Sequence, residues 1–271
     1  MKDKSEFTRL TVHDKKMRLV KVRLDYICDC EFRIIRSLFD DAFKKSFSKA
    51  PEIFECHDIH DINLSNEELV SISRNLDVSV DEIKELPFIR YSGFKRGNCH
   101  AFIDISQCYM CLTIKCENNY DGLTDYVEPI KGAFTIFQNK GFELKPMRFG
   151  VRKIRIEDFT RLDDLGSVFE PFVYNLPSFG HHDKTNLKSK YIDVFQDCSN
   201  NLRTNVVRVL ECVTDCHRNN IFSATLDIDS YFHLVGNNKI NLRDLLDYAN
   251  QKEFDTYRDC MTYEYLKSIY E

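Results

Sequence analysis

Hydrophobic and polar residues alternate along several stretches of this chain, which is the pattern of half-buried β-strands. Residues 18–26 alternate in this way, and apolar residues at helical spacing follow over residues 31–47. Three more strands are predicted over residues 88–94, 99–105 and 109–116, with turn-forming residues between them. In the last of these the alternation predicts one buried face and one wet face. This part of the chain is therefore predicted to form a strand, a helix and an antiparallel meander.

Two helical stretches and one further strand are predicted around this meander. Residues 64–86 carry two short apolar stripes at helical spacing, which favours a helical insert, and their acidic character argues against a DNA-reading helix. A helix is predicted over residues 123–139, ended by Lys140-Gly141. The strand-like run 147–156 follows it, before a shorter helix toward Phe172.

The second part of the chain, like the first, is predicted to contain a meander followed by a long helix. Residues 175–189 are rich in turn formers and polar groups and are predicted to be a linker. Strands are predicted over the three ranges 191–198, 205–215 and 221–234, followed by a helix capped by Asn241 and an amphipathic helix over residues 254–269.

We therefore predict an α+β fold of two similar halves, each an antiparallel sheet packed by long helices. The expected domains are residues 1–174, including the helical insert, and residues 190–271. A short likeness between residues 101–106 and 224–230 supports a duplicated unit.

Composition narrows the class of protein. The chain has 271 residues and a net charge of −5, which argues against a general nucleic-acid coat. It contains no apolar run long enough for a membrane helix, and residues 1–16 lack the apolar core of a signal peptide. We therefore expect a cytoplasmic protein, whose 11 cysteines are free thiols and not a disulfide framework.

The strand over residues 147–156 carries the main candidate site. Alternation places Arg148, Gly150 and Arg152 on one face, with the Cα atoms of the two arginines roughly 13 Å apart. One interpretation is a clamp for an anion or a carboxylate. The other is structural: the two arginines pair with Asp104, Asp227 or Asp229 on neighbouring strands, and the glycine admits a close approach of another chain segment.

The sequence gives weaker signals for a metal site or a catalytic site. Asp227 and Asp229 share a strand face and suit Mg²⁺ when phosphates complete its coordination, but no further carboxylates stand at a matching spacing. The segment Cys56, His57, His60 is the best zinc-ligand set, and Cys108 and Cys111 have a CxxC spacing that a strand would direct to opposite faces. No nucleophile elbow or phosphate-binding loop is present. We therefore predict no metal, no cofactor and no identifiable catalytic residue.

Three segments together resemble a sporadically distributed family of uncharacterised bacterial proteins. They are residues 21–24 leading into 32–47, the run 148–154, and residues 226–229 with the closing helix from 254 to 262. The family form of the second segment is Arg-x-Gly-x-Arg-tyrosine-x-asparagine, from which this chain departs at Lys153 and Arg155. The resemblance implies a cytosolic α+β protein without established activity, in mobile or anti-phage defence contexts.

The leading functional prediction is a non-catalytic binding protein with a role in bacterial defence. Its partner would be a protein or a small anionic ligand held near Arg148 and Arg152, and a homo-oligomer is left open. One alternative is a metal-dependent phosphoryl-transfer or nuclease-like enzyme that uses Asp104, Asp227 and Asp229. Another, less favoured, is a nucleic-acid-binding protein. No membrane partner is expected.

Overall fold

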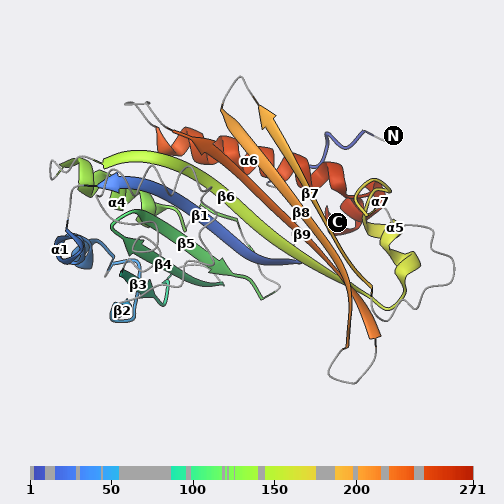
Figure 1. The fold of residues 1–271 in the computed structure, drawn as a ribbon, viewed down its shortest axis with the longest axis horizontal. Helices are drawn as coiled ribbons and strands as arrows, with labels where there is room; N and C mark the ends of the chain where they lie inside the picture. Colours follow the sequence, from blue (N-terminus) through green and yellow to red (C-terminus); the bar gives the residue numbers. More distant parts are fainter. Residues whose placement is uncertain are drawn as a thin grey trace.

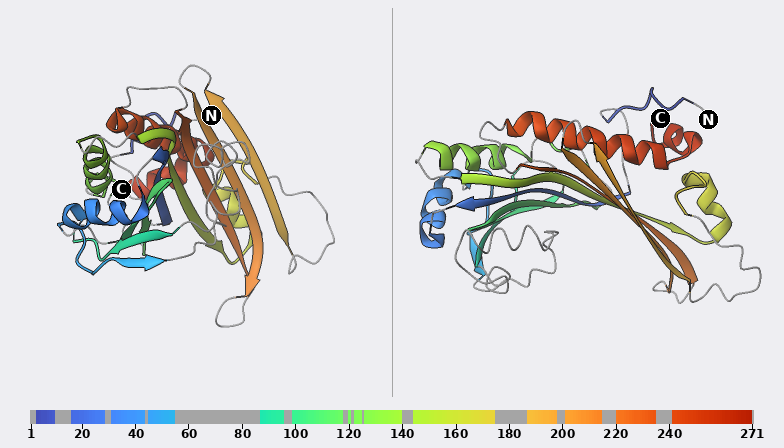
Figure 2. Two further views of the ribbon diagram at one scale, coloured as in Figure 1. Left: turned by 60° about the vertical axis from the view of Figure 1, so that its left-hand side comes forward. Right: turned by 45° about the horizontal axis from the view of Figure 1, so that its top comes forward.

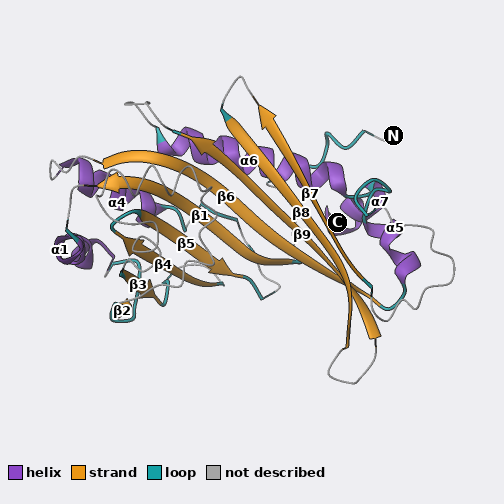
Figure 3. Cartoon of the chain, viewed as in Figure 1, coloured by secondary structure: helices purple, strands orange, loops and turns teal. Residues whose placement is uncertain are grey.

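A computed structural model of the chain describes most of the predicted elements (Figures 1 and 3). The described residues are 3–9, 16–28, 31–43, 45–54, 87–95, 99–117, 120, 122–124, 126–139, 144–174, 187–197, 201–214, 220–234 and 241–270. The strands are β1 (Met17–Cys28), β2 (Glu52–Phe54), β3 (Phe88–Ser92), β4 (His100–Ser106), β5 (Tyr109–Lys115), β6 (Leu144–Phe159), β7 (Lys188–Asp197), β8 (Leu202–Thr214) and β9 (Asn220–His233). The helices are α1 (Phe32–Phe43), α4 (Glu128–Asn139), the 3₁₀ turn η2 (Leu162–Asp164), α5 (Leu165–Val168), α6 (Leu242–Cys260) and α7 (Tyr263–Tyr270).

The nine strands form a single antiparallel sheet in the order β2-β3-β4-β5-β1-β6-β9-β8-β7. The α+β class is confirmed. The sheet is continuous, however, and not divided into two sheets, because β1 pairs with β6 along eleven residue pairs in its middle. The sheet therefore joins strands from both predicted domains, and whether those domains are separate folding units stays a prediction.

The described helices lie on one face of this sheet, which we call the helix face (Figure 2, right). Two groups of buried side chains fill the space between them. One group lies under α1, α4 and the start of α6, and the other lies under the end of α6 with α5 and α7. The strand residues of the helix face are largely apolar, so hydrophobic burial accounts for the association of the two layers.

The opposite side, which we call the polar face, carries charged residues on the central strands. The strand register shows which residues lie there. Val22 of β1 is paired with Val151 of β6, and both are buried on the helix face. Their sequence neighbours Arg23 and Arg152 therefore lie on the polar face. The face of β5 that was predicted to be exposed to water is mostly buried. Its Thr113 is buried, and Lys115 is exposed only at the strand end, because β5 is an interior strand flanked by β4 and β1.

The C-terminal helices differ from the prediction in where they break. Asn241 does cap a helix, since its side chain accepts a hydrogen bond from the backbone N–H of Arg243. That helix, α6, continues for 19 residues through Phe254 and ends near Met261. The predicted second helix is therefore the end of α6 plus the separate α7. Two predicted segments, the helical insert and residues 175–186 of the linker, lie outside the described residues, while the last two residues of the predicted linker already belong to β7.

Candidate functional site

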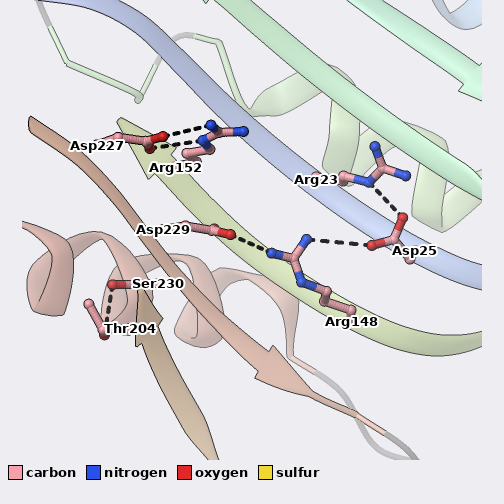
Figure 4. A network of polar contacts seen from close by, with 8 residues as sticks. All are labelled: Arg23, Asp25, Arg148, Arg152, Thr204, Asp227, Asp229 and Ser230. Atoms are coloured by element: carbon pink, nitrogen blue, oxygen red, sulfur yellow. Dashed lines mark hydrogen bonds and ion pairs between the residues drawn. The ribbon is translucent and has the colours of Figure 1, made fainter. Parts of the chain in front are cut away.

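The predicted run 147–156 is part of β6, the longest strand, which lies in the middle of the sheet. As expected, one face of β6 carries the side chains of Arg148 and Arg152 and the Cα of Gly150. This is the polar face. Six charged residues gather there on three adjacent strands and form what we call the polar-face network (Figure 4). Its members are Arg23 and Asp25 of β1, Arg148 and Arg152 of β6, and Asp227 and Asp229 of β9.

Arg152 makes the most regular pair of this network. Its Nε and Nη2 donate to the two carboxylate oxygens of Asp227 at 2.9 and 2.6 Å. A two-point contact of this kind fixes the orientation of both side chains. The side chains of Arg152 and Asp227 retain 25% and 12% of their exposure, so this is the end of the network nearest to solvent.

Arg148 lies between two carboxylates. Its Nη2 donates to Asp229 at 2.6 Å, and its Nη1 lies 3.6 Å from the Oδ2 of Asp25. Asp25 also accepts a hydrogen bond of 2.6 Å from the Nε of Arg23. These contacts join β1, β6 and β9 into a chain of alternating charge whose members are almost fully buried. Burial raises the pKa of Asp229, and the cations Arg148 and Arg152 act against that rise.

Gly150 explains how the strands approach one another here. A Cβ atom at this position would lie 2.5 Å from the Cβ of Tyr231 and 2.8 Å from the carbonyl oxygen of Ser230. The Tyr231 ring in turn lies under the guanidinium of Arg148, 4.1 Å from its centre, where a cation–π contact stabilises the buried charge. The space beside Gly150 is therefore occupied by β9.

The remaining predicted site residue, Asp104, is held elsewhere. It lies on β4 and accepts two hydrogen bonds, at 2.7 and 2.9 Å, from Arg90 of β3. Four strand spacings separate β4 from β9 in the order of the sheet, which at about 4.8 Å each places Asp104 roughly 19 Å from Asp227 along the sheet. The structure therefore brings Asp227 and Asp229 together with the two arginines but does not bring Asp104 to them.

The charges of the network cancel, because its three arginines are matched by three aspartates. The two cations of the predicted clamp are thus already neutralised, and an anion would have to compete with carboxylates for them. Lys21, directly opposite Arg152 on β1, is one further cation on this face, which is few against the many basic contacts that nucleic-acid binding uses. Some hydrogen-bonding capacity is left, because the Nη2 of Arg23 and the Nε of Arg148 are buried without a hydrogen-bond partner within the described chain.

The cysteines are consistent with buried thiols. The described ones, Cys108 and Cys111 among them, are free, and most are buried. Burial raises the pKa of Cys108 to about 12 and that of Cys260 likewise to about 12, so neither is a thiolate near neutral pH. Within the described ranges no three metal-ligating side chains come together, and residues 56–60 lie outside those ranges.

Three residues that matter to this region were missed in the sequence. Arg23 and Asp25 belong to a strand whose alternation was recognised, but its charged side was taken as solvated. The sequence held no signal for their pairing, because a strand with charged residues on one side can equally present that side to water. Glu253, whose partners are Lys153 and Arg155, had no such signal either, because a helix of mixed polarity does not reveal which glutamate is buried.

Comparison with known proteins does not add an identity. Neither the protein-family models nor the curated proteins that were searched contain a match to this chain. The resemblance to the sporadic bacterial family therefore stays a prediction, carried by the three segments of the sequence named above.

Proposed function

We propose that this protein acts by binding a protein partner and not by catalysis. The supporting observation is the outer edge of the sheet. β7 is an edge strand on which Ile192, Val194 and Phe195 keep 59, 62 and 56% of their exposure. Exposed apolar side chains on a long edge strand are a favourable place for another chain to add.

Replacing Ile192 and Val194 by lysine tests this function. Both side chains are exposed, so the double variant should keep the fold and lose the partner. Affinity purification from native cells identifies the partner, and titration of the purified partner should show a Kd at least about tenfold higher for the variant. The control is Ile53→Lys, which changes an exposed apolar side chain on β2, at the opposite edge of the sheet. Equal affinity of the two variants would contradict the proposal.

A small anionic ligand at the polar-face network is a second candidate. Its support is the unused donor capacity of Arg23 and Arg148 in a buried place. Inorganic phosphate, at constant ionic strength, is expected to raise the melting temperature of the wild type more than that of Arg152→Gln. The effect should grow as pH falls, because burial raises the pKa of Asp229 and its protonation would leave Arg148 without a charged partner on that side.

The matched control for the phosphate experiment is Arg161→Gln, since Arg161 is 72% exposed and lies 3.5 Å from Asp163 at the surface. The same melting shift in the wild type and in Arg152→Gln, or no shift at any phosphate concentration, would remove the anion candidate.

Two further parts of the proposal concern location and architecture. The free cysteines support a cytoplasmic location, and among the described residues no helix is long and apolar enough to cross a membrane. The role in bacterial defence is supported by the resemblance alone.

Similarity of the two halves is supported by the strand order. β1 and β6 pair with each other, and each of them also pairs with the last strand of a meander: β1 with β5, and β6 with β9.

A further inference from the structure

The edge strand β7 has the features of a surface that pairs with itself. It pairs with β8 over ten residues without a register shift, whereas the opposite edge, β2, has three residues. β7 contains no proline, and no bulge interrupts it. Edge strands that must stay unpaired are usually short, bulged or interrupted by proline. On this basis β7, and not β2, is the edge able to accept a strand.

The charges on β7 do not oppose a second copy of the same strand. Two lysines, Lys188 and Lys190, lie near its start, and two aspartates, Asp193 and Asp197, lie nearer its end. Their sum is zero, so two copies do not repel each other through net charge. In an antiparallel pair centred on Asp193, Lys190 lies opposite Gln196 and Asp197 lies opposite Ser189, so no lysine faces a lysine of the other copy.

The side chains also match in one register. Residues directly opposite each other in an antiparallel pair share a face of the sheet. If the two-fold axis passes by Asp193, Ile192 of each copy faces Val194 of the other on the polar face. On the helix face Tyr191 of each copy faces Phe195 of the other. The large exposed apolar side chains of β7 are all covered in this arrangement.

The one like-charge contact in this register is between the two copies of Asp193. Each Asp193 is paired with Arg208 of its own chain, which neutralises it. Two neighbouring registers also keep the faces aligned. The one centred on Ile192 places Ser189 opposite Phe195, and the one centred on Val194 places Asp193 opposite Phe195. Both leave the Phe195 ring without an apolar partner, so the axis at Asp193 is preferred.

We infer that the partner of β7 is a second copy of this chain, joined by antiparallel β7–β7 pairing into one sheet that continues through both copies. This inference rests on the proposed function and names its partner. A two-fold contact of this kind is closed, so it ends at a dimer. A ten-residue strand pair buries less surface than a permanent interface, so we expect a dimer that dissociates on dilution, with a Kd on the order of micromolar.

Charge exchange at two positions tests the inference. The variants Ile192→Lys/Val194→Lys and Ile192→Glu/Val194→Glu should each be monomers in sedimentation velocity, because like charges then face each other across the axis. An equimolar mixture of the two should form a heterodimer, because every facing pair becomes Lys against Glu. The wild type and the control Ile53→Lys, on the opposite edge strand, should show the same concentration-dependent dimer.

A wild type that stays monomeric at all concentrations, variants that still dimerise, or a mixture that stays monomeric would overturn the inference. Circular dichroism of each variant shows whether it is folded, and the substituted side chains are exposed in the single copy. If the wild type is monomeric while the lysine variant loses a different partner from native cells, the proposed binding function stands and only the identity of the partner is wrong.

Discussion

Replacing Glu253 with alanine is expected to lower the free energy of unfolding by about 3–5 kcal/mol, the largest effect of any single change considered. Glu253 is fully buried on α6, and its carboxylate accepts 2.6 and 2.7 Å contacts from Arg155 and Lys153 of β6. The alanine variant leaves these two cations buried without their counter-ion. Urea unfolding followed by circular dichroism measures the loss.

Two controls separate this effect from a general weakening of α6. Asp247→Ala removes an acidic residue of the same helix that is 62% exposed, and is expected to change stability by less than about 0.5 kcal/mol. Replacing all three residues of these ion pairs, by Glu253→Leu with Lys153→Met and Arg155→Met, should recover most of the loss, because none of the three buried charges then remains. A loss in the triple variant as large as in Glu253→Ala would show that the ion pairs are not the cause.

The same site predicts a dependence on pH. Burial alone would raise the pKa of Glu253, but Arg155 and Lys153 overcome it and hold the pKa below its ordinary value. The stabilisation is therefore complete above the unfolded-state pKa of about 4.3, and it is lost as pH falls through the lower folded-state pKa. The stability difference between wild type and Glu253→Gln should be constant near neutral pH and shrink on acidification below about pH 4.

Replacing Gly150 with alanine is expected to destabilise the protein by about 2–3 kcal/mol or more, although alanine adds one methyl group. The added Cβ would lie 2.5 Å from the Cβ of Tyr231 and 2.8 Å from a backbone oxygen of Ser230. Backbone atoms of a central strand pair cannot move aside cheaply, so β6 and β9 would have to separate. Thermal and urea unfolding measure the change.

Gly132→Ala is the matched control for Gly150→Ala. Gly132 lies within α4, and an added Cβ there would meet nothing within 4 Å. The same substitution should therefore stabilise the protein, by up to about 1 kcal/mol, since alanine is the better helix former and restricts the unfolded chain. Opposite signs for the two variants are the expected result, and equal destabilisation would show that the close approach at Gly150 is not the cause.

Local patterns predicted the strands well because the period of alternation is set by the backbone itself. The shared face of Arg148, Gly150 and Arg152 follows from that period, and the structure has it. The partner of each arginine does not follow from it. Asp104 was as good a candidate as Asp229 in the sequence, and only the strand order, with β5, β1 and β6 between β4 and β9, removes it.

The helix break was predicted wrongly for a related reason. Residues 250–254 contain two polar side chains, Asn250 and Glu253, that are buried against the sheet. Polar residues at these positions interrupt the apolar stripe from which a helix is predicted. In the structure the buried glutamate is stabilised by its ion pairs with Lys153 and Arg155 of β6. Tertiary pairing of charge therefore extended α6 through a stretch where a local apolar stripe was missing.

Local patterns were enough to predict most of the described strands, the antiparallel meanders and the shared face of the charges on β6, because these depend on neighbours within a few residues. Long-range contacts set the pairing of β1 with β6 that joins the described strands into a single sheet, and which carboxylate neutralises which arginine. They also leave β7 at the edge with its apolar side chains exposed. These outcomes depend on contacts between residues far apart in the chain, and no local period encodes them.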